Sequence, residues 1–333
     1  MSSVDVIVPC YNYGHFLREC VQSVLTQVGP RVRVLILNDA SPDNTAEIAN
    51  DLARQDPRVT VIHHLGNQGH IATYNEGIES VSADYLLLLS ADDYLLPGAL
   101  QRATSLMDTH PEISFTFGPA IRLETHTGAS YLLCTLPCWG SERLLTGQKF
   151  IEVMGATNRI ASPTVVVRTE IQKLVGGYRP DLPHAGDTEM WLRLAAHGWV
   201  GYIKTPQAVY RGHNACMSKS YMKKFLPDLQ QRELLLHYFF SCYGRGLPNG
   251  DWLEQRATYR LGCHAVSFAS GAFEKGDIAT ADELKRFAVR ISPRVRRSLP
   301  WVKFALKRML GPHITRTWRR LRARVSSRNL SAT

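Results

Sequence analysis

The chain has 333 residues, of which 44% are hydrophobic, and a formal net charge of +10. This suffices for one large domain or two smaller ones with buried cores. No apolar run approaches the ~20 residues of a membrane-spanning helix. The first residues, MSSVDVIVPCYN, lack the basic segment of a secretory signal, and among seven cysteines only Cys134 and Cys138 are close in sequence. We therefore expect reduced thiols and a cytoplasmic protein.

The first 120 residues alternate between apolar, β-branched runs and amphipathic segments. Five runs are expected to be strands, at 4–8, 32–37, 59–63, 85–89 and 113–117. Helical patterns separate them, at 15–27, 45–54, 71–81 and 97–109. Near-continuous apolar strands that alternate with helices predict an α/β fold with a doubly wound, mostly parallel sheet flanked by helices.

The rest of the chain is less regular. Residues 118–146 read as a long connection rich in Gly, Pro and Thr, for which we predict no function. A strand at 163–167, a Gly176-Gly177-Tyr178 turn and a helix at 187–197 follow, and residues 219–283 are mostly helical in pattern. We expect one domain over 1–220, a helical C-terminal extension over 221–284 and a tail over 285–333.

The tail is strongly basic. It contains 15 of the 39 Lys and Arg residues and no Asp or Glu, which leaves 24 basic residues against 29 acidic ones elsewhere. One helical face is expected to carry the apolar residues Trp301, Phe304, Ala305, Leu306, Met309 and Leu310. Cations beside such a face are typical of a helix at an anionic membrane surface. A solvated tail and a nucleic-acid segment are the alternatives; because the chain has no nucleic-acid-binding motif, we expect no nucleic-acid partner.

Four polar segments follow the predicted strands, with the sequences PCYN (9–12), NDASPD (38–43), NQGH (67–70) and SADD (90–93). Loops at the carboxyl ends of such a sheet form its ligand site. These loops suit a nucleotide: Tyr11 can stack on a base, Asp39 can accept from a base N–H, and Asp92 can bind a cation on phosphates. Carboxylates select a hard ion, Mg²⁺ or Mn²⁺. Taken singly, each loop is also compatible with ordinary turn and helix-cap chemistry.

The sequence lacks both G-x-G-x-x-G after the first strand and G-x-x-x-x-G-K-[ST], which argues against a Rossmann dehydrogenase and a P-loop enzyme. Instead, six blocks over residues 4–220 resemble the family-2 glycosyltransferases, which have the GT-A fold. The blocks are VIVPCYN, LNDASPDNT, NQGHIATYNEGI, LSADD, GGYRPDLPHAGDTEMWLRLAAHG and YRGHNACMS. The resemblance implies an inverting transfer from a nucleoside-diphosphate sugar, expected to be a UDP-sugar, to a saccharide or lipid-linked acceptor. Cell-surface polysaccharide biosynthesis is the expected setting, with possible recruitment to the cytoplasmic membrane face.

The resemblance also assigns residues to the donor site. Asn38 and Ala40 replace the family's Asp and Gly around Asp39, and Tyr74 stands where Arg is common. The positions that match nucleotide-sugar-binding positions are Pro9, Tyr11, Asn12, Asp39, Asn67, Gly69, Asn75, Ala91 and Arg211.

The metal and the base follow from the later blocks. Ser90-Ala91-Asp92 stands where many members have D-x-D, so Asp92 keeps the metal position and Asp93 is expected to orient the loop or a water. His213, from the family's R-x-H motif, would be the second metal residue. Asp187 matches the Asp of the E-D motif and is the implied catalytic base; a helix cap is the alternative, and a helix N-terminus would favour its charged form.

Two other functions remain open at this point. A sugar-nucleotide-forming nucleotidyltransferase would share the sheet and the metal, but it should have a Gly-rich, cationic loop after the first strand, which PCYNYGHF is not. A catalytically inactive nucleotide- or sugar-binding module is the second alternative. It is kept open by the departures from the family pattern at Ser90, Gly186 and Tyr74.

Overall fold

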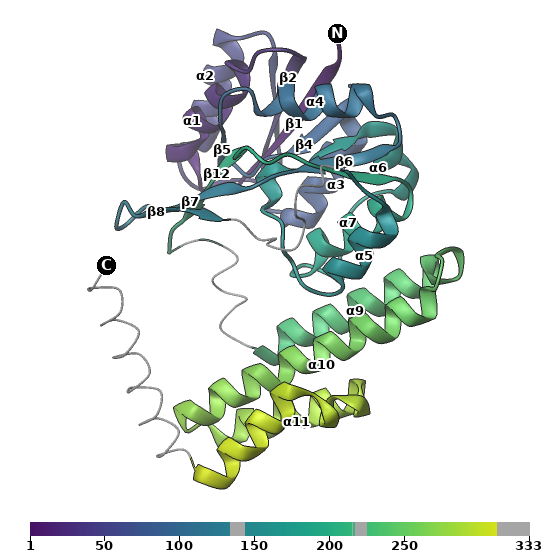
Figure 1. The fold of residues 1–333 in the computed structure, drawn as a ribbon. Coiled ribbons are helices and arrows are strands. Elements are labelled where there is room, and N and C mark those ends of the chain that lie inside the picture. The colour runs from purple at the N-terminus through teal and green to yellow at the C-terminus, as the bar shows by residue number, and fades with distance from the viewer. Residues whose placement is uncertain (134–143, 215, 217–224, 312–333) are drawn as a thin grey trace, which may run out of the picture. The chain divides into compact units, whose positions relative to one another are not determined.

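The computed structural model describes residues 1–133, 144–214, 216 and 225–311. The chain forms two compact units, one of residues 1–154 and 158–220 and the other of residues 155–157 and 221–333 (Figure 1). The Cys134 and Cys138 pair and the tail beyond residue 311 lie outside the described residues.

The predicted alternation of strands and helices in the first 120 residues is confirmed. The elements are β1 Ser3–Cys10, α1 Gly14–Leu25, β2 Arg31–Asn38, α2 Thr45–Gln55, β3 Val59–His63, α3 His70–Ser80, β4 Tyr85–Leu88, β5 Tyr94–Leu95, α4 Ala99–Thr109 and β6 Ile113–Phe117. Helix α4 begins two residues after Pro97, because Gly98 takes a left-handed conformation at its cap.

The larger sheet has eight strands in the order β3-β2-β1-β4-β10-β6-β11-β9. Strands β1 to β4 are parallel to one another where they pair, as are β6 and β11, whereas β10 runs antiparallel between β4 and β6. The prediction of a doubly wound, mostly parallel sheet is confirmed. The remaining elements of this unit are β7 Ala120–Glu124, β8 Ser130–Leu133, β9 Leu144–Leu145, α5 Gly147–Met154, η1 Ser162–Thr164, β10 Val166–Arg168, α6 Thr169–Val175, α7 Gly186–Ala196, β11 Trp199–Tyr202 and β12 Ala208–Gly212.

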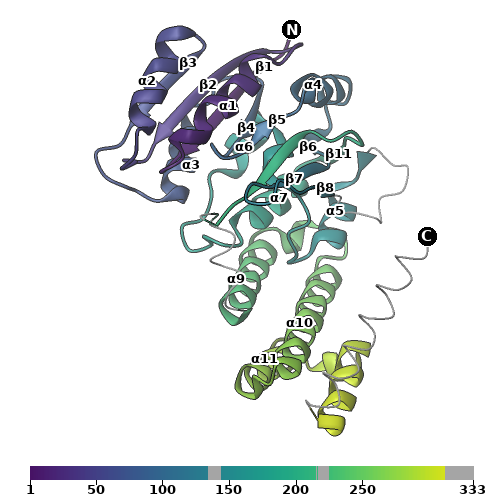
Figure 2. The ribbon, with the colours of Figure 1, turned by 90° about the vertical axis from the view of Figure 1, so that its left-hand side faces the viewer.

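Side chains of β1 alternate between two buried layers. Val4, Val6 and Val8 join a core cluster with residues of α1, α2 and α4. Ile7 points the opposite way, toward α3, where a Cβ at Gly77 would lie 2.4 Å from the Ile7 side chain. Helices therefore cover both faces of the sheet (Figure 1, Figure 2), and the β1 residues from Val4 to Val8 are all buried.

The expectation of an irregular connection over residues 118–146 is wrong for its described part. Strands β7 and β8 form a hairpin there, and a second sheet has the order β5-β12-β7-β8. The turn closes through a Gly128 N–H that donates to the Glu124 carbonyl at 2.8 Å, with Gly128 at φ +70°. Strand β8 is only four residues long and is largely exposed, although Tyr131, Leu132 and Leu133 are apolar.

The second unit is helical, with α9 Phe225–Tyr243, η2 Gly244–Gly246, α10 Gly250–Lys275, α11 Ile278–Ile291, η3 Pro293–Arg297 and a helix over residues 299–311. Helix α11 runs through position 285, so the first basic residues of the expected tail belong to this unit. No helix in the described ranges combines the length and the apolarity needed to cross a bilayer.

The predicted apolar face of the tail needs one correction. Phe304 is 2% exposed, because its ring packs against Phe273 of α10. Lys307 and Arg308 pair with Glu274 and Asp282, which holds the same side of the helix against its own unit. The exposed apolar residues of this helix are Leu299, Val302, Ala305, Leu306, Met309 and Leu310.

Candidate functional site

The loops at the carboxyl ends of β1, β2 and β4 meet the start of α3 around a cavity of about 370 Å³. The size suits a ligand of small-molecule dimensions. The cavity brings together five of the predicted donor-site residues, Pro9, Tyr11, Asp39, Asn67 and Gly69. The other lining residues are Cys10, Tyr13, His70, Thr73, Tyr74 and Ser90. Of these, Tyr13, His70 and Thr73 lie within or next to the motif blocks but were not singled out from the sequence.

Asn12 and Ala40 have positive φ and lie next to lining residues of the cavity rather than in its wall. Asn12 has φ +62° and its N–H donates to Ser41 Oγ at 3.0 Å, which ties the first loop to the second. Ala40 has φ +54°. A residue with a Cβ pays about 1–2 kcal/mol of conformational free energy in the left-handed region. Glycine would avoid this cost at position 40.

Asp39 is buried and its carboxylate organises the third loop. It accepts hydrogen bonds from the N–H groups of Gln68 at 2.7 Å and Gly69 at 3.0 Å, and from the ring of His64 at 2.7 Å. Burial alone would raise the pKa of Asp39, but these hydrogen bonds outweigh it and lower the pKa below its usual value. Asp39 is therefore an ionised acceptor in the wall of the cavity.

Asp92 and Asp93 lie in different environments, which explains how two adjacent carboxyl groups are tolerated at the end of an apolar strand. Asp93 is 1% exposed and accepts the backbone N–H of Arg211 at 2.9 Å. Burial, reinforced by the charge of Asp92, raises the pKa of Asp93 well above its usual value. The surroundings of Asp93 thus favour its neutral form more than water does for an exposed carboxyl group.

Asp92 lies beside two further potential metal donors. Its Oδ2 is 3.0 Å from His213 Nε2, and ligand atoms of Asp92, His213 and Cys216 all lie within 4.8 Å of one another. The His213 ring is held between Tyr13 and Phe16, each with its ring centroid 5.3 Å away. A carboxylate, an imidazole and a thiol form a donor set that can hold a divalent metal ion.

The structure places Arg211 and Ala91 next to the cavity rather than in its wall. The Arg211 guanidinium donates to the Asp92 carbonyl at 2.7 Å and pairs with Glu19, and it lies over the rings of Phe16 and Tyr94. Ala91 is fully buried in the core cluster. In this geometry both residues position the Asp92 loop.

Asp187 lies in the first turn of α7, not at the cap, which is Ala185. Burial raises the pKa of Asp187 to about 6, although a hydrogen bond with Tyr178 lowers it in part. The direction is opposite to the one expected from the helix N-terminus, because loss of solvent outweighs the dipole. A carboxylate with this pKa is suited to proton transfer near neutral pH.

Tyr178 links Asp187 to the donor loops. Asn75, a predicted donor-site residue on α3, accepts the Tyr178 N–H at 2.6 Å and donates to its carbonyl at 2.9 Å. A Cβ at Gly177 would lie 2.4 Å from the Asn75 amide, so the turn requires glycine. The Tyr178 ring contacts that of Tyr74, which lines the cavity. Asn75 therefore supports the Asp187 region through its amide.

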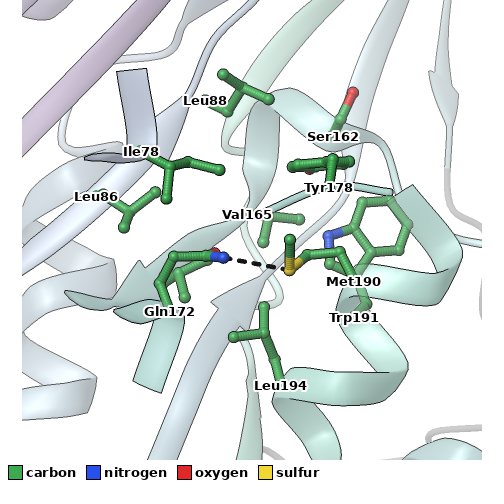
Figure 3. A pocket seen from close by; sticks show the side chains of 11 residues that line it. Ile78, Leu86, Leu88, Ser162, Val165, Gln172, Tyr178, Met190, Trp191 and Leu194 are labelled. Carbon is green, nitrogen blue, oxygen red and sulfur yellow. Dashed lines mark hydrogen bonds between the residues drawn. The ribbon is translucent and has the colours of Figure 1, made fainter. Parts of the chain in front are cut away.

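An apolar layer lies behind Tyr178. Leu86 and Leu88 of β4 face Met190, Trp191 and Leu194 of α7 around a void of about 20 Å³ (Figure 3). The Gln172 amide closes one side and donates to Met190 Sδ at 3.3 Å (Figure 3). This layer keeps water from one side of the Tyr178 ring and makes Trp191 a core residue, 2% exposed.

The N-terminal part of the chain is similar to a known protein family. Residues 5–159 match the family model described as Glycosyl transferase family 2. A relative named "Uncharacterized glycosyltransferase EpsJ" from Bacillus subtilis (strain 168) is 38% identical over 101 residues, which cover 30% of this chain and 29% of the relative. "Putative glycosyltransferase EpsH" from the same organism is 26% identical over 231 residues, covering 68% and 65%. The chain thus spans less than two thirds of either relative.

Among solved structures, that of S. aureus TarS residues 1–349 in complex with UDP-GlcNAc is similar, with a TM-score of 0.56 and 15% identity. The match covers 89% of this chain and 92% of that one. At this identity the likeness establishes the fold, and the GT-A architecture expected from the sequence is confirmed.

Proposed function

Because residues 5–159 match the model of glycosyl transferase family 2, we propose that the protein transfers a sugar from a nucleoside-diphosphate sugar to a saccharide or lipid-linked acceptor. The observation that supports this most is the cavity in which Pro9, Tyr11, Asp39, Asn67 and Gly69 meet. It offers an aromatic face, an ionised acceptor and exposed amides, as a nucleotide requires. The TarS structure described with UDP-GlcNAc supports UDP as the first nucleotide to test.

In this proposal Asp187 is the base of an inverting, single-displacement reaction. Its pKa of about 6 leaves it mostly ionised at pH 7, yet basic enough to take the proton of an acceptor hydroxyl. One carboxylate suffices, because a direct displacement forms no glycosyl-enzyme intermediate. Tyr178 and Asn75 would hold Asp187 in position.

A divalent ion, Mg²⁺ or Mn²⁺, would be held by Asp92 and His213. When bound, it would stabilise the charge that develops on the departing diphosphate. The imidazole and the neighbouring Cys216 thiol are softer donors than oxygen and bind first-row transition ions in preference to Mg²⁺. Of the two ions, the residues present therefore favour Mn²⁺. Arg211 would keep Asp92 in place through its carbonyl and through Glu19.

We assign the transfer to residues 1–220 and propose that the basic C-terminal segment places the enzyme at the cytoplasmic face of a membrane. A lipid-linked acceptor and a role in surface polysaccharide biosynthesis would be consistent with a location at the membrane. The exposed residues Leu299, Val302, Leu306 and Met309 form an apolar stripe beside exposed Lys303, as expected of a surface that meets anionic lipid.

The test is calorimetric titration of UDP, GDP and dTDP with and without Mn²⁺, on the full chain and on Asp92→Asn. Asp51→Asn is the matched control, because it neutralises an acid that pairs with Arg18 outside the cavity. Metal-dependent binding of one nucleotide, lost only in Asp92→Asn, supports the proposal and identifies the nucleobase of the donor. Absence of binding to all three contradicts it, and binding without any sugar transfer points to the inactive module.

A further inference from the structure

His64, at the end of β3, lies between two carboxyl groups. Its Nδ1 is 2.7 Å from Asp39 Oδ1, and its Nε2 is 2.7 Å from Glu76 Oε2 of α3. The His64 side chain is 3% exposed and that of Asp39 is 5% exposed, whereas Glu76 reaches solvent with 37% of its side chain exposed. The two short contacts use both ring nitrogens of a buried imidazole.

The partners determine which protonation state this arrangement favours. Ionised carboxylates only accept hydrogen bonds, and a neutral imidazole has only one N–H to donate. A neutral His64 would therefore direct a lone pair at one of the two carboxylates. The imidazolium form donates to both and places a positive charge between two negative ones.

The neighbouring histidine shows the contrast. His63 Nδ1 lies 3.0 Å from the Asn38 amide nitrogen, and its Nε2 lies 3.0 Å from Asn50 Oδ1. An amide NH₂ can only donate, so Nδ1 of His63 accepts and Nε2 donates. Adjacent histidines thus face opposite kinds of partner, amides at His63 and carboxyl groups at His64.

We infer that His64, as an imidazolium bridged to Glu76, is a positioning residue that holds Asp39 in its nucleotide-binding orientation. Asp39 Oδ1 receives His64 and the Gln68 N–H, while Oδ2 receives the Gly69 N–H. The His64 ring thus fixes the rotation of the carboxylate and helps to hold the 67–69 loop. This inference rests on the proposed function, in which Asp39 contacts the base.

The charges around His64 give the pH dependence its sign. Burial alone would lower the pKa of His64, but Asp39 and Glu76 outweigh it and raise the pKa above 6.5. The charge of Asp39 also acts on His70 of α3, which lines the same cavity. The bridge is complete below pH 6.5 and is lost as the pH rises through the raised pKa of His64.

The experiment measures UDP affinity by calorimetry from pH 6 to 9, together with the ¹⁵N shifts of the His64 ring in the ligand-free protein. The variants are His64→Gln and Glu76→Gln, and His63→Gln is the matched control. We expect the wild-type Kd to rise about 10-fold as His64 deprotonates, since a hydrogen bond to a charged group is lost. Glu76→Gln should move that rise to lower pH. His64→Gln should bind about 10-fold more weakly at pH 6 with a flat profile.

Several results would overturn the inference. A neutral His64 ring at pH 6, or a His64→Gln protein with wild-type affinity and pH profile, would show that Asp39 does not depend on this charge. A shifted profile in His63→Gln would show that any change near this strand end has the same effect. The ring shifts need no nucleotide, so a charged His64 in a protein that binds no nucleotide would refute the proposed function while retaining the bridge. Thermal melting of each variant separates local effects from unfolding.

Discussion

Tyr178→Phe removes the hydroxyl that hydrogen-bonds to Asp187 and leaves the ring in its apolar layer. Burial raises the pKa of Asp187 to about 6, and the Tyr178 hydroxyl holds it below the value that burial alone would give. Without that hydroxyl, the ionised form of Asp187 loses its hydrogen-bond donor. The pKa of Asp187 should therefore rise further, and the base should be active only at higher pH.

The magnitude follows from the energy of one hydrogen bond to a charged group, about 1.5–3 kcal/mol. Each pKa unit corresponds to about 1.4 kcal/mol, so the pKa of Asp187 should move to roughly 7–8. At pH 7 the ionised fraction, and with it kcat/KM, should fall about 2- to 10-fold. At pH 9 the variant should approach the wild-type rate, because Asp187 is then ionised in both proteins.

The assay is the pH dependence of kcat/KM for nucleotide release with the chosen donor and acceptor. Tyr85→Phe is the matched control, because it also removes a buried tyrosine hydroxyl that donates to an aspartate, Asp108 at 2.6 Å, far from the α7 turn in the sequence. The acid limb should stay near pH 6 in Tyr85→Phe. If the acidic pKa of the kcat/KM profile is unchanged in Tyr178→Phe, or is displaced to lower pH, the assignment of Asp187 as the catalytic base is refuted.

Three further substitutions test the electrostatics and the strain of the site. Asp187→Asn should abolish turnover yet stabilise the fold at pH 7 by up to about 3 kcal/mol, because the pKa rises from 3.8 to about 6 on folding and each unit costs about 1.4 kcal/mol once Asp187 is ionised. A lower melting temperature would contradict this. Ala40→Gly should add about 1 kcal/mol in urea unfolding by relieving the left-handed backbone, and no gain would mean that Ala40 is unstrained. Asp93→Asn should keep metal-dependent nucleotide binding, because burial already disfavours the charged form of Asp93, whereas equal loss of binding in Asp93→Asn and Asp92→Asn would show that the charge of Asp93 is also needed.

The periodicity of the first 120 residues was enough to predict the sheet and the sites of its loops. Apolar runs that end in polar segments identify the carboxyl ends of parallel strands, and Tyr11, Asp39 and Asn67 indeed line one cavity. The β7–β8 hairpin was not predicted, because its two short strands lie in a segment rich in Gly, Pro and Thr, where the apolar run of β8 has no regular period to set it apart.

The sequence by itself determined which chemical groups gather at the sheet edge, because local patterns and motif order place them there. Only the tertiary structure decided what each group can do. Contacts between residues far apart in the chain lower the pKa of Asp39, raise the pKa of Asp93 and bring the pKa of Asp187 to about 6. The same holds for His64, whose charge depends on Asp39 and Glu76 and cannot be read from its neighbours in the sequence. Solvation and charge–charge distance set these properties, and both are created by folding.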